Sequence, residues 1–269
     1  MSGSRSKDRL PTWQEFGEDL LNTYDLDPIY PMVAGAGLDD DTMKRWCLAY
    51  WCYYDAGVCC AIAELPSKDF YAAMYQGVDE GWPRGMERRY FYSKIARDTI
   101  RGLKDFGPPE KVVDAMTFHR DYITIVQSVQ SFTGFGPWIS WKIADMTDRV
   151  LGWYVDFLEA NLYMYRDPVK GAAYILTGDK NYKITSEELN GVVYMMLTHF
   201  KGYLAPPFQD RIVNVQEIET ILCKYKAHCF GHYPWGNDTI HVAKALEGWG
   251  DMANHMSLML DKYTAYKEV

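Results

Sequence analysis

The sequence predicts a mostly α-helical protein with two lobes and a cleft between them. Apolar residues recur at three- and four-residue intervals along nearly the whole chain, and capping residues precede several of these runs. Alternating apolar and polar residues, which are typical of strands, are scarce. The 269 residues are enough to bury a sizeable core. The expectation of two lobes rests on a hairpin between helices, which is described below.

The first segment, residues 1–11, is small and polar and predicts a flexible arm, followed by a single two-lobed domain over residues 12–269. The arm holds no apolar run, so no secretory signal is expected. Thr12 and Glu15 have the spacing of a capping box and predict a helix behind them. The run Trp46–Leu65 is almost long enough to span a bilayer, but Asp55 lies in its middle, so a buried helix is favoured.

The remaining helices follow the same periodicity. Pro108 and Pro109 introduce a helix expected over Lys111–Phe132, and Pro137 begins one expected over Pro137–Val150. Later helices are expected in the segments 185–200, 214–228 and 238–266. We therefore expect helices throughout the domain.

The cysteines and charges restrict the class of protein. The six cysteines favour reduced, buried thiols over a metal site, because the spacing of Cys223, Cys229 and His232 matches no zinc or iron–sulfur pattern. The net charge of −8 argues against indiscriminate binding of nucleic acid. However, the segment from Arg84 to Lys104 carries +5. On a helix, Lys94, Arg97, Arg101 and Lys104 would share one face. This face is either a phosphate-binding surface or a solvated helix face.

A Gly-Phe-Gly-Pro turn lies between the two helices expected at 111–132 and 137–150. Gly134 and Gly136 allow positive φ and close backbone approach, and Pro137 suits a first helical turn. Free N–H groups at such a helix start can bind a phosphate oxygen. The pattern indicates a helix-hairpin-helix element that contacts the DNA backbone through Gly134, Phe135, Gly136, Trp138 and Lys142. The alternative is a tight turn without a ligand.

The stretch GFGPWISWKIADM resembles the hairpin of the helix-hairpin-helix DNA glycosylases. In that family a catalytic Asp follows about twenty residues after the second hairpin glycine, and Asp156 occupies this position here. Asp156 is followed by Phe-Leu rather than by small, polar residues. Trp138 stands where some glycosylases hold a Schiff-base lysine. The resemblance therefore implies a base-flipping fold and argues against lyase chemistry.

A closer resemblance covers nearly the whole chain. The blocks GWPRGMERRYFYSKIA, YRDPVKGA, CKYKAHCFGHYPWGND and ALEGWGDMA are similar to those of the phage α-glutamyl/putrescinyl thymine pyrophosphorylases, or amino acid:DNA transferases. The resemblance implies replacement of the pyrophosphate on 5-hydroxymethyluracil in DNA by an amine. The implied partners are DNA with a modified thymine and an amino acid or polyamine, with no membrane. The implied location is the cytoplasm of an infected bacterium. No cofactor is evident, and the sequence leaves open both the amine and the need for a divalent metal.

Three groups of residues could carry this chemistry. Arg84, Arg88 and Arg89 could hold the leaving pyrophosphate, or else contact the DNA backbone or pair with acids. Asp156 could accept the proton of the amine, hold its ammonium form, stabilise positive charge on the ring, or be structural. Further catalytic candidates are Lys142, Asp145, His232 and Asp238. The candidate DNA contacts outside the hairpin are Arg97, Arg101, Lys224 and Lys226. Two aromatic residues, Tyr233 and Trp235, could stack a base.

Two other functions remain open at this point. A monofunctional glycosylase acting on a modified pyrimidine would release a free base. A non-catalytic module would bind DNA without turnover. Release of pyrophosphate that depends on an added amine would distinguish the transferase from both.

Overall fold

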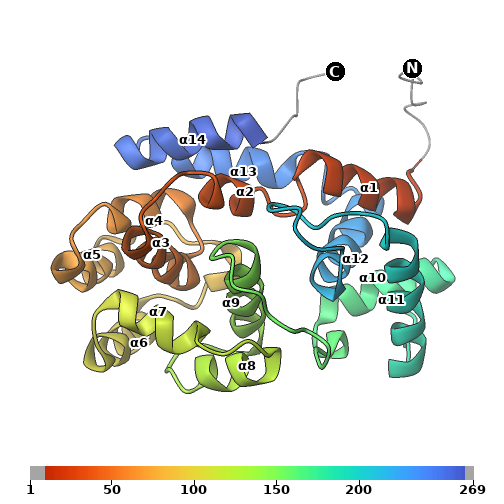
Figure 1. Cartoon of the computed structure of the whole chain (residues 1–269), viewed down its shortest axis with the longest axis horizontal. Coiled ribbons are helices and arrows are strands. Elements are labelled where there is room, and N and C mark those ends of the chain that lie inside the picture. Colours follow the sequence, from red (N-terminus) through yellow and green to blue (C-terminus); the bar gives the residue numbers. More distant parts are fainter. Residues whose placement is uncertain (1–9, 264–269) are drawn as a thin grey trace. The chain divides into compact units, whose positions relative to one another are not determined.

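The computed structural model describes residues 10–263. Within this range the chain forms fourteen α-helices and two short 3-10 helices, with two isolated bridges in place of strands (Figure 1). The prediction of a mostly helical protein is confirmed. Residues 1–9 of the predicted arm and residues 264–266 of the last predicted helix lie outside the described residues.

The chain divides into two compact units. Of the described residues, the first unit holds 10–26, Asn161–Ala205 and Gln209–Asn237. The second holds Asp27–Ala160, Pro206–Phe208 and 238–263. The arrangement into two lobes with a cleft stays a prediction.

The first unit is built on capped helices. They are α1 (Trp13–Thr23), the 3-10 helix η2 (Leu162–Met164), α10 (Arg166–Thr177), α11 (Ser186–Phe200) and α12 (Val215–Cys229). The capping box predicted at Thr12 and Glu15 is present, and Thr185 with Glu188 forms a second one. Phe16 of α1, Phe200 of α11 and Ile221 of α12 are fully buried. These apolar residues form the core of the unit.

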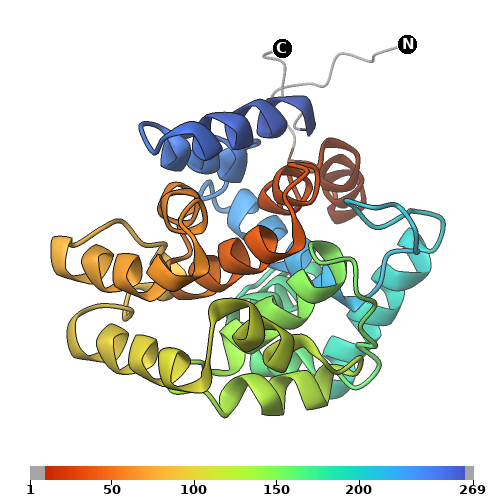
Figure 2. The same cartoon turned by 60° about the vertical axis from the view of Figure 1, so that its left-hand side comes forward.

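The second unit holds the remaining elements. They are α2 (Ile29–Ala34), α3 (Asp40–Tyr53), α4 (Ala56–Ala63), α5 (Ser67–Glu80), η1 (Met86–Arg88), α6 (Ser93–Phe106), α7 (Pro109–Thr117), α8 (Tyr122–Gln130), α9 (Pro137–Arg149), α13 (Asn237–Leu246) and α14 (Asp251–Tyr263). Trp46 and Trp51 of α3 and Trp141 of α9 are buried in its core. The dark blue α14 lies against α2 and α4 (Figures 1 and 2).

The single helix predicted over Lys111–Phe132 is wrong, because the segment forms two helices, α7 and α8. The Arg120 guanidinium donates to the carbonyls of Thr117, Phe118 and His119 and so satisfies the end of α7. Asp121 then accepts from the Thr124 N–H and caps α8. Side-chain hydrogen bonds thus replace the backbone bonds that a continuous helix would make.

Two other predicted helices are also divided. The run Trp46–Leu65 is buried as expected, but it breaks at Tyr54, whose φ is 56°, and Asp55 caps α4. The helix predicted from Asp238 is split into α13 and α14 by Gly248 and Gly250, which have φ of 81° and 95°. The helix predicted over Pro137–Val150 is present as α9.

Candidate functional site

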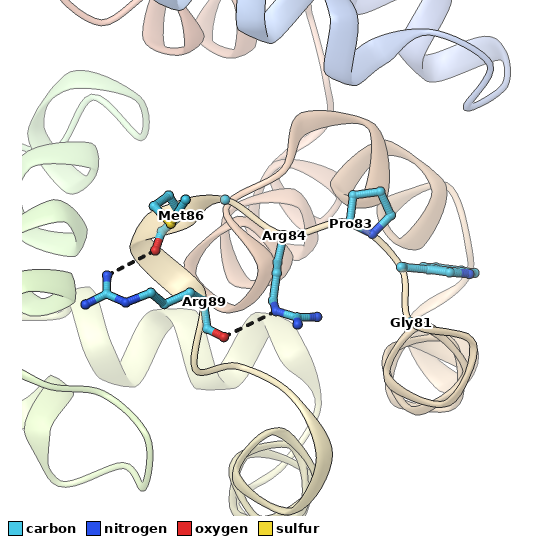
Figure 3. Close-up of a pocket in the computed structure, with 7 residues that line it drawn as sticks. Gly81, Pro83, Arg84, Met86 and Arg89 are labelled. Atoms are coloured by element: carbon cyan, nitrogen blue, oxygen red, sulfur yellow. Dashed lines mark hydrogen bonds between the residues drawn. The ribbon is translucent and has the colours of Figure 1, made fainter. Parts of the chain in front are cut away.

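The arginine loop, Gly81–Arg89, connects α5 to α6 and lines a pocket of about 380 Å³ (Figure 3). The loop is fixed to the end of α3, because the Gly85 N–H donates to the Tyr53 carbonyl at 2.9 Å. A Cβ at position 85 would lie 2.5 Å from the Tyr54 carbonyl oxygen. Glycine is therefore required for this close approach, and the pocket is part of a fixed turn.

Two of the three predicted arginines line this pocket. Arg84 and Arg89 are exposed, and Arg84 Nε donates to the Arg89 carbonyl at 3.4 Å. Arg89 Nη1 donates to the Met86 carbonyl at 3.3 Å (Figure 3). Among residues 10–263 neither guanidinium forms an ion pair with a carboxylate. The pocket therefore presents two positive charges that can meet an anion.

Arg88, the third predicted arginine, lies elsewhere. Its side chain is half-buried, with Nε donating to the Cys52 carbonyl at 3.2 Å and Nη1 donating to the Gly134 carbonyl at 3.1 Å. The guanidinium also lies over the rings of Phe91 and Phe135. Arg88 does not line the pocket and instead connects the arginine loop to the hairpin turn.

The hairpin turn, Thr133–Gly136, precedes α9 as expected. Gly134 has φ of 89°, and a Cβ there would lie 2.0 Å from Thr99 Oγ1. Gly136 has an ordinary φ of −104°, so only one of the two glycines needs the left-handed region. No side chain caps this end of α9, and Pro137 is its first residue. The ring of Phe135 is buried, so it is not placed to contact DNA, and the hairpin contact with DNA stays a prediction.

Lys142 and Asp145 belong to a largely buried charge cluster, which we define as Asp27, Tyr30, Lys142, Asp145 and Arg149. Arg149 Nη1 donates to Asp27 Oδ2 at 2.8 Å, and the Tyr30 hydroxyl donates to Asp145 Oδ2 at 2.6 Å. Lys142 Nζ lies 3.5 Å from Asp27 Oδ1 and 3.6 Å from Asp145 Oδ2. The structure thus brings these two predicted residues together, but in the interior rather than on an exposed DNA-binding face.

The cluster alters the titration of its members. Burial lowers the pKa of Lys142, but the negative charge of Asp27 and of its other neighbours outweighs this and raises the pKa well above its usual value. Burial, followed by the Asp145 carboxylate, raises the pKa of the Tyr30 phenol. Lys142 is consequently a stable cation and Tyr30 a neutral hydrogen-bond donor at neutral pH.

Asp156 is exposed in the second unit, in the segment that follows α9. Two backbone hydrogen bonds fix its position. The Asp156 N–H donates to the Arg120 carbonyl at 2.7 Å, and the Tyr122 N–H donates to the Asp156 carbonyl at 2.9 Å. Its carboxylate accepts from the Leu158 N–H at 2.8 Å. The fixed backbone and solvent-facing side chain suit a group that meets a substrate.

The basic face of α6 is partly neutralised. Arg97 forms an ion pair with Asp79, and Arg101 forms one with Asp98. Lys94 and Lys104 are exposed and have no carboxylate partner among the described residues. Within the basic segment 84–104, the exposed cations without a carboxylate partner among the described residues are therefore Arg84, Arg89, Lys94 and Lys104.

The segment from Lys224 to Asp238 is more internal than expected. Lys224 is buried, and its ammonium donates to the Asp25 carbonyl at 2.6 Å and to the Tyr233 hydroxyl at 2.9 Å. Lys226 forms an ion pair with Asp167. Tyr233 is buried, so it is not placed to stack a base.

The other residues predicted in this segment have different surroundings. The Trp235 ring is half-buried and lies 4.9 Å from those of Phe16 and His228. His232 is exposed. Asp238 is half-buried at the start of α13 and belongs to the second unit.

Sequence reasoning missed Asp27, Tyr30 and Arg149 as members of the charge cluster. Arg149 could have been found, because it follows Asp145 by four residues on one helix and so shares its face. Asp27 and Tyr30 come from a separate segment and carry no such signal. Over residues 10–263 no group of three His, Cys, Asp or Glu side chains could hold a metal. In the same range, every helix is too short or too polar to cross a bilayer.

The chain is similar to known proteins over most of its length. It is 34% identical over 277 residues to the glycinyltransferase of Pseudomonas phage PaMx11, covering 93% of this chain and 94% of that relative. It is 28% identical over 253 residues to the putrescinyltransferase of Delftia phage PhiW-14, covering 91% of this chain and 81% of that relative. Residues 22–233 match the family described as amino acid:DNA transferase. This match includes the arginine loop, the hairpin turn and Asp156, and the chain therefore belongs to the amino acid:DNA transferase family and is a transferase.

Proposed function

We propose that the protein transfers an amine, either an amino acid or a polyamine, onto pyrophosphorylated 5-hydroxymethyluracil in DNA. Amine transfer in phage DNA modification is the activity that the family and the two relatives support. The observation that carries the detailed proposal is a pair of arginines, Arg84 and Arg89, which line one pocket and have no acidic partner among residues 10–263. The setting of the reaction is the cytoplasm of an infected bacterium.

The reaction exchanges one bond at the exocyclic methylene of the base. The bond from carbon to the pyrophosphate oxygen breaks, its electron pair leaves with the pyrophosphate, and a bond from carbon to the amine nitrogen forms. The nitrogen then gives up one proton. Such a step needs an extruded base, a positively charged site for the leaving group and an acceptor for the proton.

Arg84 and Arg89 are proposed to bind the pyrophosphate. Negative charge on the leaving oxygen grows as the carbon–oxygen bond breaks, so a guanidinium beside it binds the transition state more strongly than the ground state. The pocket of about 380 Å³ is roomy enough for a small anion. Arg88 contributes by holding the arginine loop against the hairpin turn.

Asp156 is proposed to accept the proton of the amine or to hold its ammonium form. It is the exposed carboxylate among the predicted catalytic carboxylates, whereas Asp145 is fully buried in the charge cluster. In this proposal Lys142 and Asp145 maintain the shape of α9 behind the hairpin turn. The hairpin turn binds the DNA backbone through its N–H groups, and the roles of His232 and Asp238 stay predictions.

Mass spectrometry of nucleosides tests the function. The protein is incubated with DNA containing pyrophosphorylated 5-hydroxymethyluracil and a pool of amines, and the DNA is then digested. We expect a thymine derivative with a new carbon–nitrogen bond and an equal amount of released pyrophosphate. Release of a free base would instead identify a glycosylase. Binding of DNA without any product would indicate a non-catalytic DNA-binding protein.

A further inference from the structure

A group of large apolar and aromatic side chains is exposed beside the arginine loop. Met86 is 74% exposed, Tyr90 is 61% exposed and Tyr92 is 49% exposed. They come from η1 and from the short segment that leads into α6. Large exposed side chains that gather in one short segment are typical of a binding surface. We call the two tyrosines, Tyr90 and Tyr92, the aromatic platform.

Positive charge accompanies the platform. The Arg89 guanidinium lies 4.6 Å from the centre of the Tyr90 ring, and the Arg84 guanidinium lies 5.3 Å from that of Tyr92. Lys94 follows two residues later and has no carboxylate partner within residues 10–263. From Arg84 to Lys94 the sequence holds four basic residues and one acidic residue, Glu87. Rings flanked by unpaired cations complement a chain of phosphates and bases.

Packing and backbone hydrogen bonds fix the segment that carries the two tyrosines. Phe91, between the two exposed tyrosines, is buried and packs edge-on against Tyr53 with ring centres 5.0 Å apart. The Phe91 N–H donates to the Arg88 carbonyl at 2.7 Å, and the Tyr92 N–H donates to the Tyr90 carbonyl at 2.9 Å. Tyr90 and Tyr92 are thus directed outward on a fixed backbone. A rigid platform loses little conformational entropy when a ligand binds.

We propose that the aromatic platform binds an unpaired stretch of DNA by stacking its bases, while Lys94 contacts a phosphate. The proposal rests on the proposed function in one respect: a base that is extruded for transfer leaves its partner base unpaired and removes a stacking contact from its neighbours. Stacking tolerates every base because each has an aromatic face. The platform therefore adds affinity for single-stranded DNA without reading sequence.

Binding of unmodified DNA tests this without any transfer reaction. Labelled single-stranded and double-stranded oligonucleotides are titrated by fluorescence anisotropy with the full chain and with Tyr90→Ala and Tyr92→Ala. Loss of one stacked base costs about 1–3 kcal/mol, so we expect single-strand affinity to fall about five- to 150-fold in each variant. Tyr90→Phe and Tyr92→Phe should restore it, because the ring and not the hydroxyl makes the contact.

Tyr194→Ala is the matched control, because Tyr194 on α11 is likewise an exposed tyrosine, at 74%, but no arginine of residues 10–263 lies over its ring. It should bind DNA as the unaltered protein does, and circular dichroism should show all variants folded. Unchanged single-strand affinity in both alanine variants would overturn the proposal. Equal losses for single and double strands, or a change in self-association in place of DNA binding, would overturn it too.

The two proposals can fail separately. If the unaltered protein transfers no amine but the platform variants lose single-strand affinity, the platform stands and the transfer reaction is wrong. If transfer occurs and the platform variants bind normally, the platform is wrong and the transferase stands.

Discussion

Arg84, Arg88 and Arg89 are close in sequence, but their side chains have different surroundings. Arg84 and Arg89 face a pocket, whereas Arg88 is bound to the carbonyls of Cys52 and Gly134. The sequence could place all three in one loop. It could not predict that their side chains have different surroundings. The 3-10 turn directs each side chain differently, and no pattern in the sequence marks that turn.

We predict that Arg84→Ala or Arg89→Ala lowers the single-turnover rate at saturating DNA by about a hundredfold, as loss of one charge-stabilising donor commonly does. The measurement is a rapid-quench assay of pyrophosphate release. Arg166→Ala, an exposed arginine at the start of α10, is the control and should keep the normal rate. Near-normal rates with only weaker DNA binding would show that the leaving group is bound elsewhere.

The cysteines should differ in reactivity. Burial raises the pKa of the Cys52 thiol to about 12 and that of Cys60 to about 12, so these thiols stay protonated at pH 8. Cys223 and Cys229 are only half-buried. We predict that iodoacetamide modifies the latter two first in the folded protein, as peptide mass spectrometry would show. Early modification of Cys52 or Cys60 would contradict the burial.

Asp145→Asn should destabilise the fold. The change removes a charge from beside Lys142 and Arg149, and breaking a buried ion pair commonly costs about 3–5 kcal/mol. Urea denaturation at neutral pH measures this. Asp98→Asn is the control, since its pair with Arg101 is much more exposed and should matter little.

The pH dependence of this cluster follows from the raised pKa of Lys142. A raised pKa in the folded state gives stability that is complete below the unfolded value of about 10.4. That stability is lost as the pH rises through the folded value. The unfolding free energy, measured in increasingly alkaline buffers, should therefore begin to fall only above a pH of about 10.4, the unfolded pKa of lysine. Lys142→Met should make this fall smaller.

At the scale of elements, the two hairpin glycines provide a matched pair. Gly134→Val forces a side chain into a φ of 89° and against Thr99, so we predict a lower melting temperature. A Cβ added at Gly136 would meet no atom within 4 Å, and φ is ordinary there, so Gly136→Val should leave the fold intact. We predict that it weakens DNA binding by shielding the start of α9. Unchanged affinity at low and moderate salt would make the hairpin purely structural.

The sequence predicted where helices exist better than where they end. A capping box and a proline identified the starts of α1 and α9, because those signals act within a few residues. The breaks between α7 and α8 and between α3 and α4 escaped prediction. The first depends on hydrogen bonds from Arg120 and on pairing with the distant Asp156 segment, and neither is visible in local periodicity.

At the scale of the whole molecule, the net charge of −8 predicts that DNA is bound through local positive surfaces and not over the whole protein surface. We predict that Lys94→Glu lowers the slope of log affinity against log salt by about one or more. Charge reversals at Arg97 and Arg101 should also lower it if DNA phosphates displace Asp79 and Asp98. Titrations at several salt concentrations measure all three, and an unchanged slope would exclude the α6 face.

Arg88 connects the arginine loop to the hairpin turn. The pocket of the loop is proposed to bind pyrophosphate, and the turn is proposed to bind the DNA backbone. We predict that this shared contact couples the two binding equilibria. Whatever factor DNA contributes to pyrophosphate affinity, pyrophosphate must contribute to DNA affinity, since linkage is reciprocal. If each ligand strengthens binding of the other, the protein binds the modified strand less tightly once pyrophosphate departs, and it is then free to move to its next thymine.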